Sequence, residues 1–145
     1  MSNIGNVLRE QGKYSEALAK YEESLAIRER LVGREHMEVA TSLSNIGSVL
    51  DSQGKYSEAL AKYEESLAIK ERLVGREHMD VAASLSSIGI VLREQGKYSE
   101  ALAKYEESLG IMERLVGRED MDVATSLSNI GIVLREQEKY SEALA

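Results

Sequence analysis

Apolar residues recur along this chain at steps of one, three and four positions, which is the spacing of one face of an α-helix. In the clearest stretch, from Met79 to Gln95, this apolar stripe consists of Val81, Ala82, Leu85, Ile88, Gly89 and Leu92. A second stretch, from Tyr98 to Val116, carries at the same spacing Ala101, Leu102, Tyr105, Leu109, Met112, Leu115 and Val116. No window alternates strictly between apolar and polar residues, as a half-buried strand would. The pattern predicts an all-α protein.

Glycine separates the two amphipathic stretches and ends the second. Gly96-Lys97 lies between them, and Gly117 directly follows Val116. Glycine adopts the left-handed backbone conformation that closes a helix C-terminus at little steric cost. We therefore expect two antiparallel helices joined by a tight turn.

This helix pair is repeated along the chain with a period of 42 residues. Three copies span residues 2–43, 44–85 and 86–127, and a partial fourth copy spans 128–145. The first and second copies differ at six positions, and the second and third at eight. Self-similarity at a fixed period of this size is typical of solenoids, in which each repeat packs against its neighbours. The sequence thus predicts a single repeat array over residues 1–145.

Each copy resembles the tetratricopeptide repeat. In the second copy the motif is carried by Ile46-Gly47, Leu50, Gly54, Tyr56, Ala59 and Tyr63. The resemblance implies a right-handed superhelical solenoid of antiparallel helix pairs. It also implies that Gly47 and Ala59 let paired helices approach closely, and that Tyr56 and Tyr63 fill the junction between hairpins. Repeats of this family usually have about 34 residues. The longer period is similar to that of kinesin light chain-type repeats, which carry a segment like Leu-Val-Gly-Arg-Glu-His.

Composition and charge exclude several classes of function. A formal net charge of −7 argues against nucleic-acid binding, which needs clustered Lys and Arg. The sequence has no stretch of about 18 apolar residues that would predict a membrane span. Its N-terminus lacks the basic and apolar regions of a signal peptide. The sequence contains no cysteine, so disulfides and thiolate metal sites are excluded. We expect a cytoplasmic protein without nucleic-acid or membrane partners.

The side chains capable of catalysis or metal binding do not form a recognisable site. His36 and His78 are the only histidines, and the third copy has Asp120 at that position. A role near a helix start is favoured over metal binding, which needs several converging ligands. Adjacent glutamates such as Glu64-Glu65 point about 100° apart on a helix and cannot share a substrate. No phosphate-binding GxxxxGK[ST] loop occurs. We expect no enzymatic activity, no cofactor and no metal.

The positions at which the copies differ indicate a binding surface. Most lie on the first helix of a copy, spaced by three, four or seven residues, whereas the second helix varies mainly at Arg28, Lys70 and Met112. Drift at exposed positions is the alternative explanation. In proteins that resemble this one, the variable face lines a concave groove, which implies a protein or peptide partner. The expected groove residues are Asn3, Asn6, Arg9, Glu10, Thr41, Asn45, Ser48, Asp51, Ser52, Ala83, Ser87, Ile90, Arg93, Glu94, Thr125, Asn129, Ile132, Arg135 and Glu136.

One subset of the family binds acidic C-terminal tails through a clamp of Lys, Arg and Asn, and that clamp is absent here. Asn6 and Asn45 fit it, but Ser2, Ala83 and Ser87 occupy the cationic positions. Two alternatives to a peptide-binding scaffold stay open. The chain could be the recognition array of a larger signalling protein of the nucleotide-switch, NLR-like kind, or a self-assembling or designed repeat protein.

The first and the last helical hairpin of the sequence are expected to be incomplete. The opening helix, Ser2 to about Gln11, lacks the counterpart of Met37 to Leu43, and Tyr140 to Ala145 is expected to be only the start of a second helix. The last complete helix, Met121 to Gln137, would then keep an apolar stripe with too little covering it. We expect the ends to associate with another copy of the chain.

Overall fold

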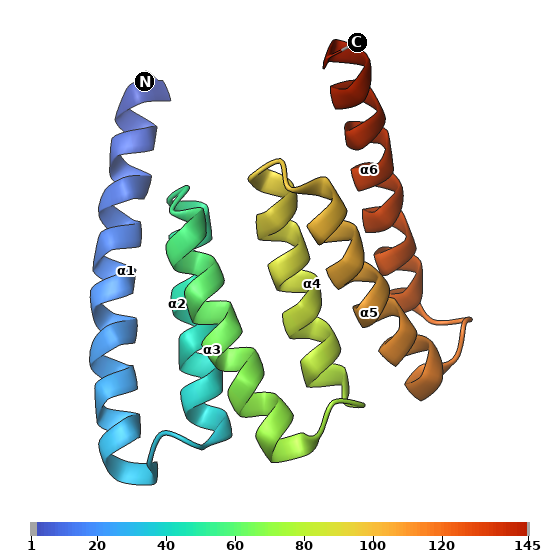
Figure 1. Ribbon diagram of the computed structural model, residues 1–145. Helices are drawn as coiled ribbons and strands as arrows, with labels where there is room; N and C mark the ends of the chain where they lie inside the picture. Colours follow the sequence, from blue (N-terminus) through green and yellow to red (C-terminus); the bar gives the residue numbers. More distant parts are fainter. Residues whose placement is uncertain (1–2, 145) are drawn as a thin grey trace. The chain divides into compact units, whose positions relative to one another are not determined.

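The computed structural model describes residues 3–144, with side chains described from residue 12 onward, and these residues form six α-helices (Figure 1). The helices are α1 (Asn3–Val32), α2 (Met37–Ser52), α3 (Tyr56–Val74), α4 (Met79–Glu94), α5 (Tyr98–Val116) and α6 (Met121–Leu144). No strand occurs within 3–144, so the all-α prediction is confirmed. The chain divides into two compact units, residues 1–69 and 70–145, with the boundary inside α3. A single array over the whole chain stays a prediction.

The turn between the two helices of a hairpin has the predicted glycine conformation. Gly96 has a φ of +79°. The amide of Lys97 donates to the carbonyl of Leu92, and the amide of Gly96 to that of Arg93, both at 2.9 Å. This pair of bonds is the Schellman motif, which satisfies carbonyls left free at the end of α4. Gly54, with a φ of +78°, ends α2 in the same way.

The histidines lie at helix starts, as expected, and they also cap those helices. His36 Nδ1 accepts a hydrogen bond from the amide of Glu38 at 3.1 Å, and His78 Nδ1 accepts one from Asp80 at 3.0 Å. In the third copy Asp120 Oδ1 accepts the equivalent bond at 2.8 Å. Either His or Asp can occupy this position, because both side chains can accept a hydrogen bond from an unpaired amide of the first turn.

The two helices of a hairpin approach closely at a glycine. A Cβ on Gly47 would lie 3.1 Å from the ring of Tyr63, and one on Gly89 would lie 3.1 Å from the ring of Tyr105. The expected close approach at Gly47 is therefore confirmed. The ring of Tyr63 lies against Gly47 of its own hairpin, and a role of Tyr63 at the junction with the next hairpin stays a prediction.

A buried serine also joins the paired helices. Ser66 Oγ donates to the carbonyl of Ala40 at 2.7 Å and lies 2.7 Å from Ser44 Oγ. Ser108 makes the same contacts with Ala82 and Ser86 at 2.8 Å. Because the side chains of Ser66 and Ser108 are fully buried, these bonds satisfy polar groups that would otherwise destabilise the hairpin.

The variable position of the second helix of a hairpin contacts the first helix of the next hairpin. Arg28 of α1 donates to Ser42 Oγ of α2 at 2.5 Å, and Lys70 of α3 donates to Ser84 Oγ of α4 at 2.9 Å. In the third copy the hydroxyl of Ser126 on α6 donates to the Met112 sulfur of α5 at 3.3 Å. Variation at this position therefore lies in the interface between successive hairpins.

Lys70→Met, which introduces the residue of the third copy, is expected to raise the free energy of unfolding by ~0.5–1 kcal/mol at pH 7. Burial lowers the pKa of the Lys70 amine, and the charge of Asp80 only partly opposes this. The unfolded chain therefore binds more protons between the folded and unfolded pKa values, and stability rises with pH across that window. The variant should lose this rise. Urea unfolding at pH 7 and at pH 10 measures both effects.

The matched control is Lys20→Met, because Lys20 is an exposed lysine whose ion pair with Glu23 spans 3.7 Å. It should change stability by less than about 0.5 kcal/mol. A loss of stability in Lys70→Met would show that the hydrogen bond to Ser84 outweighs the cost of burying the amine.

The first and the last helix are longer than predicted. The opening helix does not end near Gln11, since α1 continues to Val32, and the last does not end at Gln137, since α6 continues to Leu144. At the second site Glu138 stands where the other copies have glycine. A left-handed turn there would strain the backbone, so the helix continues.

Gly12 needs a different explanation, because residues 9–14 are identical in sequence to residues 93–98, which contain a turn. The turn at Gly96 belongs to a hairpin in which two full-length helices bury Gly89 against Tyr105. In α1 the same six residues continue as helix, so this segment does not encode the turn by itself.

Candidate functional site

The expected groove residues of α2 lie outside the core of unit 1. Thr41, Ser48 and Ser52 are exposed, and Asn45 and Asp51 are half-buried. The core side of the same helix is formed by Val39, Leu43 and Ile46, each at most 1% exposed. The variable residues of α2 are thus accessible to a partner.

In unit 2 the expected residues of α4 and α6 are also exposed or half-buried. They are Ala83, Ser87, Ile90, Arg93 and Glu94 on α4, and Thr125, Asn129, Ile132, Arg135 and Glu136 on α6. We call these ten residues of unit 2 the first-helix surface. The remaining expected residues, Asn3, Asn6, Arg9 and Glu10, belong to the helical backbone of α1, but their side chains lie outside the described residues.

Charged residues of both α4 and α6 affect the pKa of Tyr105 on α5. Burial raises the pKa of its hydroxyl; Arg93 lowers that pKa, and Glu94 and Glu136 raise it further. These charges come from two helices and act on one phenol. A tyrosine hydroxyl is protonated at neutral pH even at its ordinary pKa, so the Tyr105 hydroxyl is a hydrogen-bond donor there.

Four buried side-chain polar atoms lack a hydrogen-bond partner among the described residues, and two of them are Oε1 of Gln53 and Gln95 at the ends of α2 and α4. The other two are the hydroxyl of Tyr105 in unit 2, whose side chain is fully buried, and Asp51 Oδ1 in unit 1. Most buried polar groups in proteins are satisfied, so such atoms require an explanation. Asp51 and Arg93 occupy the same position in successive copies. In each unit a potential site of hydrogen bonding therefore lies on or next to a variable residue.

Sequence reasoning missed Tyr105 as a site residue. Its position in the repeat is occupied by tyrosine in every copy that contains it, as Tyr21, Tyr63 and Tyr105. That invariance indicated a packing role, which the contact with Gly89 confirms. The ring was identifiable from the sequence, but the surroundings of the hydroxyl depend on the three-dimensional packing of three helices.

The sequence profile of the tetratricopeptide repeat matches residues 1–72 and 80–145, which is most of the chain. The chain belongs to the tetratricopeptide repeat family. Tetratricopeptide repeat proteins are commonly protein–protein interaction scaffolds. No curated protein matches the sequence.

Solved structures of tetratricopeptide repeat proteins share this fold. BtubC (BKLC) from P. vanneervenii superimposes with a TM-score of 0.80 at 24% identity, over 97% of this chain and 56% of that one. The nearly identical TPR-like repeats of a Podosopora anserina protein described as a kinesin light chain give 0.78 at 20% identity, over 97% and 66%. A crystal structure of a point variant of those repeats gives the same values. The chain thus spans only about 56–66% of the length of these relatives.

Tetratricopeptide repeat scaffolds are typically non-enzymatic. Across the described part of this chain, no three His, Asp or Glu residues are grouped so that they could hold a metal ion. Within the same residues, no helix is long and apolar enough to cross a membrane.

Proposed function

We propose that this tetratricopeptide repeat chain is an interaction scaffold whose first-helix surface binds a peptide segment of a partner protein. The observation that best supports this is the buried hydroxyl of Tyr105, which has no hydrogen-bond partner among the described residues. The hydroxyl is inaccessible in this structure, so a peptide carbonyl would accept a hydrogen bond from it, and satisfy the group, after the side chains that cover it move aside.

The side chains around Tyr105 suggest the chemistry of the peptide. Ile90 on α4 and Ile132 on α6 are half-buried and offer apolar contacts. Arg93 and Glu136 add one charge of each sign close enough to affect the pKa of the phenol. The best ligand is therefore an extended segment that carries apolar residues and charges of both signs, with a free backbone carbonyl for the Tyr105 hydroxyl.

Tyr105→Phe is the sharpest test, because it removes one oxygen and keeps the ring against Gly89. A buried hydroxyl without a partner costs desolvation and contributes no hydrogen bond to the fold, so the free energy of unfolding should be unchanged or rise by up to about 1 kcal/mol. Affinity for a captured partner should fall roughly 3- to 10-fold, as for the loss of one hydrogen bond. Affinity capture followed by titration of the identified peptide measures this.

Arg93→Glu should weaken the same interaction, whereas Glu106→Gln should not. Glu106 is an exposed residue of α5 and serves as the matched control in unit 2. Partners that bind equally well to the wild type, Tyr105→Phe and Arg93→Glu would refute the proposed binding surface.

A further inference from the structure

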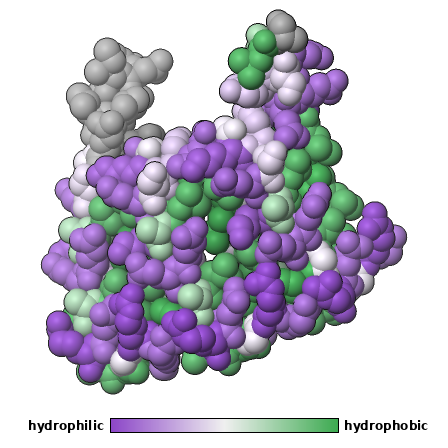
Figure 2. Space-filling view, viewed as in Figure 1, coloured by the Kyte–Doolittle hydropathy of each residue, from purple (hydrophilic) through white to green (hydrophobic). Residues whose placement is uncertain are grey.

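The apolar face of α6 is left uncovered by the described chain. Leu127 and Leu134 are 39% and 50% exposed, whereas their counterparts on α4, Leu85 and Leu92, are 1% and 4% exposed. A Cβ on Gly131 would have nothing within 4 Å. Apolar surface along α6 is visible in Figure 2. In the third hairpin, formed by α4 and α5, the equivalent face of α4 is covered by α5. No such second helix covers α6 among the described residues.

The second-helix part of α1, residues 14–32, has the complementary exposed face. Tyr21 and Ile27 are 37% and 48% exposed. Their counterparts on α5, Tyr105 and Ile111, are 0% and 1% exposed. In the third hairpin those two positions belong to the side of α5 that packs on α4.

The two uncovered faces match in sequence as well as in exposure. Residues 14–32 differ from residues 98–116 of α5 only at positions 26 and 28. Residues 121–137 differ from residues 79–95 of the third hairpin only at positions 125 and 129. The exposed faces of α6 and of residues 14–32 therefore correspond to the two halves of an interface that the chain already forms between α4 and α5.

We propose that α6 of one molecule packs against residues 14–32 of a second copy, and that this contact reproduces the α4–α5 hairpin between molecules. A contact between two different surfaces of the same chain is heterologous, so it can propagate from copy to copy without closing. The continuous α6 corrects the expected end of that helix, but it leaves Leu127 and Leu134 exposed for this contact.

An arginine series along the inter-helix loops indicates the register of the contact. Arg34 pairs with Glu65 at 2.7 Å, and Arg76 pairs with Glu107 at 2.5 Å. In both cases the glutamate lies 31 positions further on, in the next second helix. Arg118 is the next member of the series and pairs with Glu113 at 2.7 Å, as Arg34 and Arg76 also pair with a glutamate five positions earlier. The described residues contain no glutamate 31 positions further on for its second contact.

Glu23 of a second copy would complete this series, because it occupies the repeat position of Glu65 and Glu107. In its own chain Glu23 has an exposed contact with Lys20 at 3.7 Å. The proposed packing brings Glu23 of the second copy beside Arg118, which is exposed on the loop between α5 and α6.

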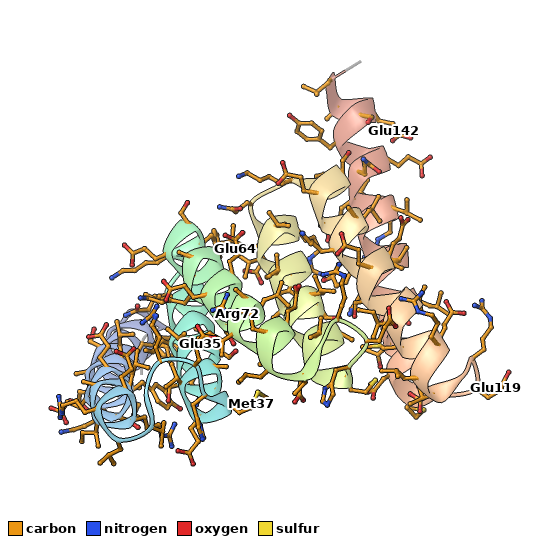
Figure 3. The ribbon with its side chains drawn as sticks, turned by 60° about the horizontal axis from the view of Figure 1, so that its bottom comes forward. Glu35, Met37, Glu64, Arg72, Glu119 and Glu142 are labelled. Carbon is orange, nitrogen blue, oxygen red and sulfur yellow. The ribbon has the colours of Figure 1, made fainter. Side chains whose placement is uncertain are left out.

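A second ion pair supports the same register. Arg114 donates to both carboxylate oxygens of Glu77, at 2.9 Å and 2.7 Å, and this bond lowers the pKa of Glu77 and raises that of Arg114. The counterparts of these two residues at the ends of the chain are Glu119 and Arg30. Glu119 lies on the loop between α5 and α6 (Figure 3). The proposed contact pairs it with Arg30 of the second copy.

Charge reversal tests the register in the full 145-residue chain. Light scattering over a concentration series should show the wild-type mass rising with concentration. Arg118→Glu and Glu23→Arg should each weaken association roughly 3- to 10-fold, because an ion pair becomes a like-charge contact. An equimolar mixture of the two variants should recover the wild-type mass, since every contact between them again joins one arginine to one glutamate.

Gly131→Leu tests the apolar part of the contact without disturbing the monomer. Its side chain has open space in the chain itself but would meet Tyr21 of the second copy, as Gly89 meets Tyr105. The variant should stay folded by circular dichroism and remain a monomer at concentrations where the wild type associates. Wild-type mass for Gly131→Leu, a strictly monomeric wild type, or a variant mixture that fails to recover would each overturn the proposal. None of these positions belongs to the first-helix surface, so the outcome is independent of peptide binding.

Discussion

Gly89→Leu is expected to lower the free energy of unfolding by ~1–3 kcal/mol, because a side chain there must displace the ring of Tyr105. A Cβ alone would lie 3.1 Å from that ring, which is buried and cannot move aside without separating α4 from α5. Chemical denaturation at a protein concentration low enough to keep the chain monomeric provides the measurement. Gly47→Leu should behave similarly, since Tyr63 lies at the same distance in unit 1.

Gly131→Leu is the matched control for this experiment. Gly131 has the same repeat position and nearly the same neighbours in sequence, but nothing lies within 4 Å of its Cβ site. Leucine favours a helix over glycine, so this variant should be unchanged or up to about 1 kcal/mol more stable. Equal losses at Gly89 and Gly131 would show that helix propensity or the denatured state, and not contact with Tyr105, determines the effect.

The interior hairpins could be predicted closely from the sequence because local and long-range preferences agree there. The predicted second helix of the third copy has the observed bounds, Tyr98–Val116, and the first ends one residue earlier than predicted, at Glu94. Apolar spacing, the turn glycine and the small residue facing a tyrosine all favour the same structure. Because these local signals agree, the periodic pattern was sufficient to predict the helices of the interior hairpins.

The end copies show where that reasoning fails. Residues 9–14 and 93–98 have one sequence and two structures, so the turn at Gly96 is not encoded locally. It forms where two long helices can bury their apolar faces against each other. At Glu138 the sequence did contain the signal, since glycine is replaced by a residue that disfavours a left-handed turn.

The candidate site could be predicted only in part. Variable positions identified accessible residues of the first helices, but they did not distinguish ligand contacts from drift. The contacts of Arg28, Lys70 and Met112 could not be predicted, because the partner of each is a serine 14 residues away, on a different helix. Which side of a helix faces the next copy depends on how the helices pack, and a single helical stripe does not specify it.

Deleting residues 44–85, one full copy, is expected to lower the free energy of unfolding by about 2–6 kcal/mol, taking roughly 0.05–0.15 kcal/mol per residue. The deletion joins Leu43 to Ser86 in register, so each remaining copy keeps its own sequence. The loss should exceed that of an isolated hairpin because copies also stabilise one another. The ring of Tyr98 meets that of Tyr140, in the next copy, edge-on at 6.2 Å, and Met112 of α5 contacts Ser126 of α6 in the next hairpin.

Urea denaturation followed by circular dichroism distinguishes the possible outcomes. For coupled repeats, the midpoint should fall and the transition should become less steep, because less surface is exposed on unfolding. Duplicating the same copy is the reciprocal experiment and should raise both quantities. If the midpoint is unchanged in both proteins, each hairpin folds independently of its neighbours. The contacts between successive hairpins at Ser42, Ser84 and Ser126 would then contribute little to stability.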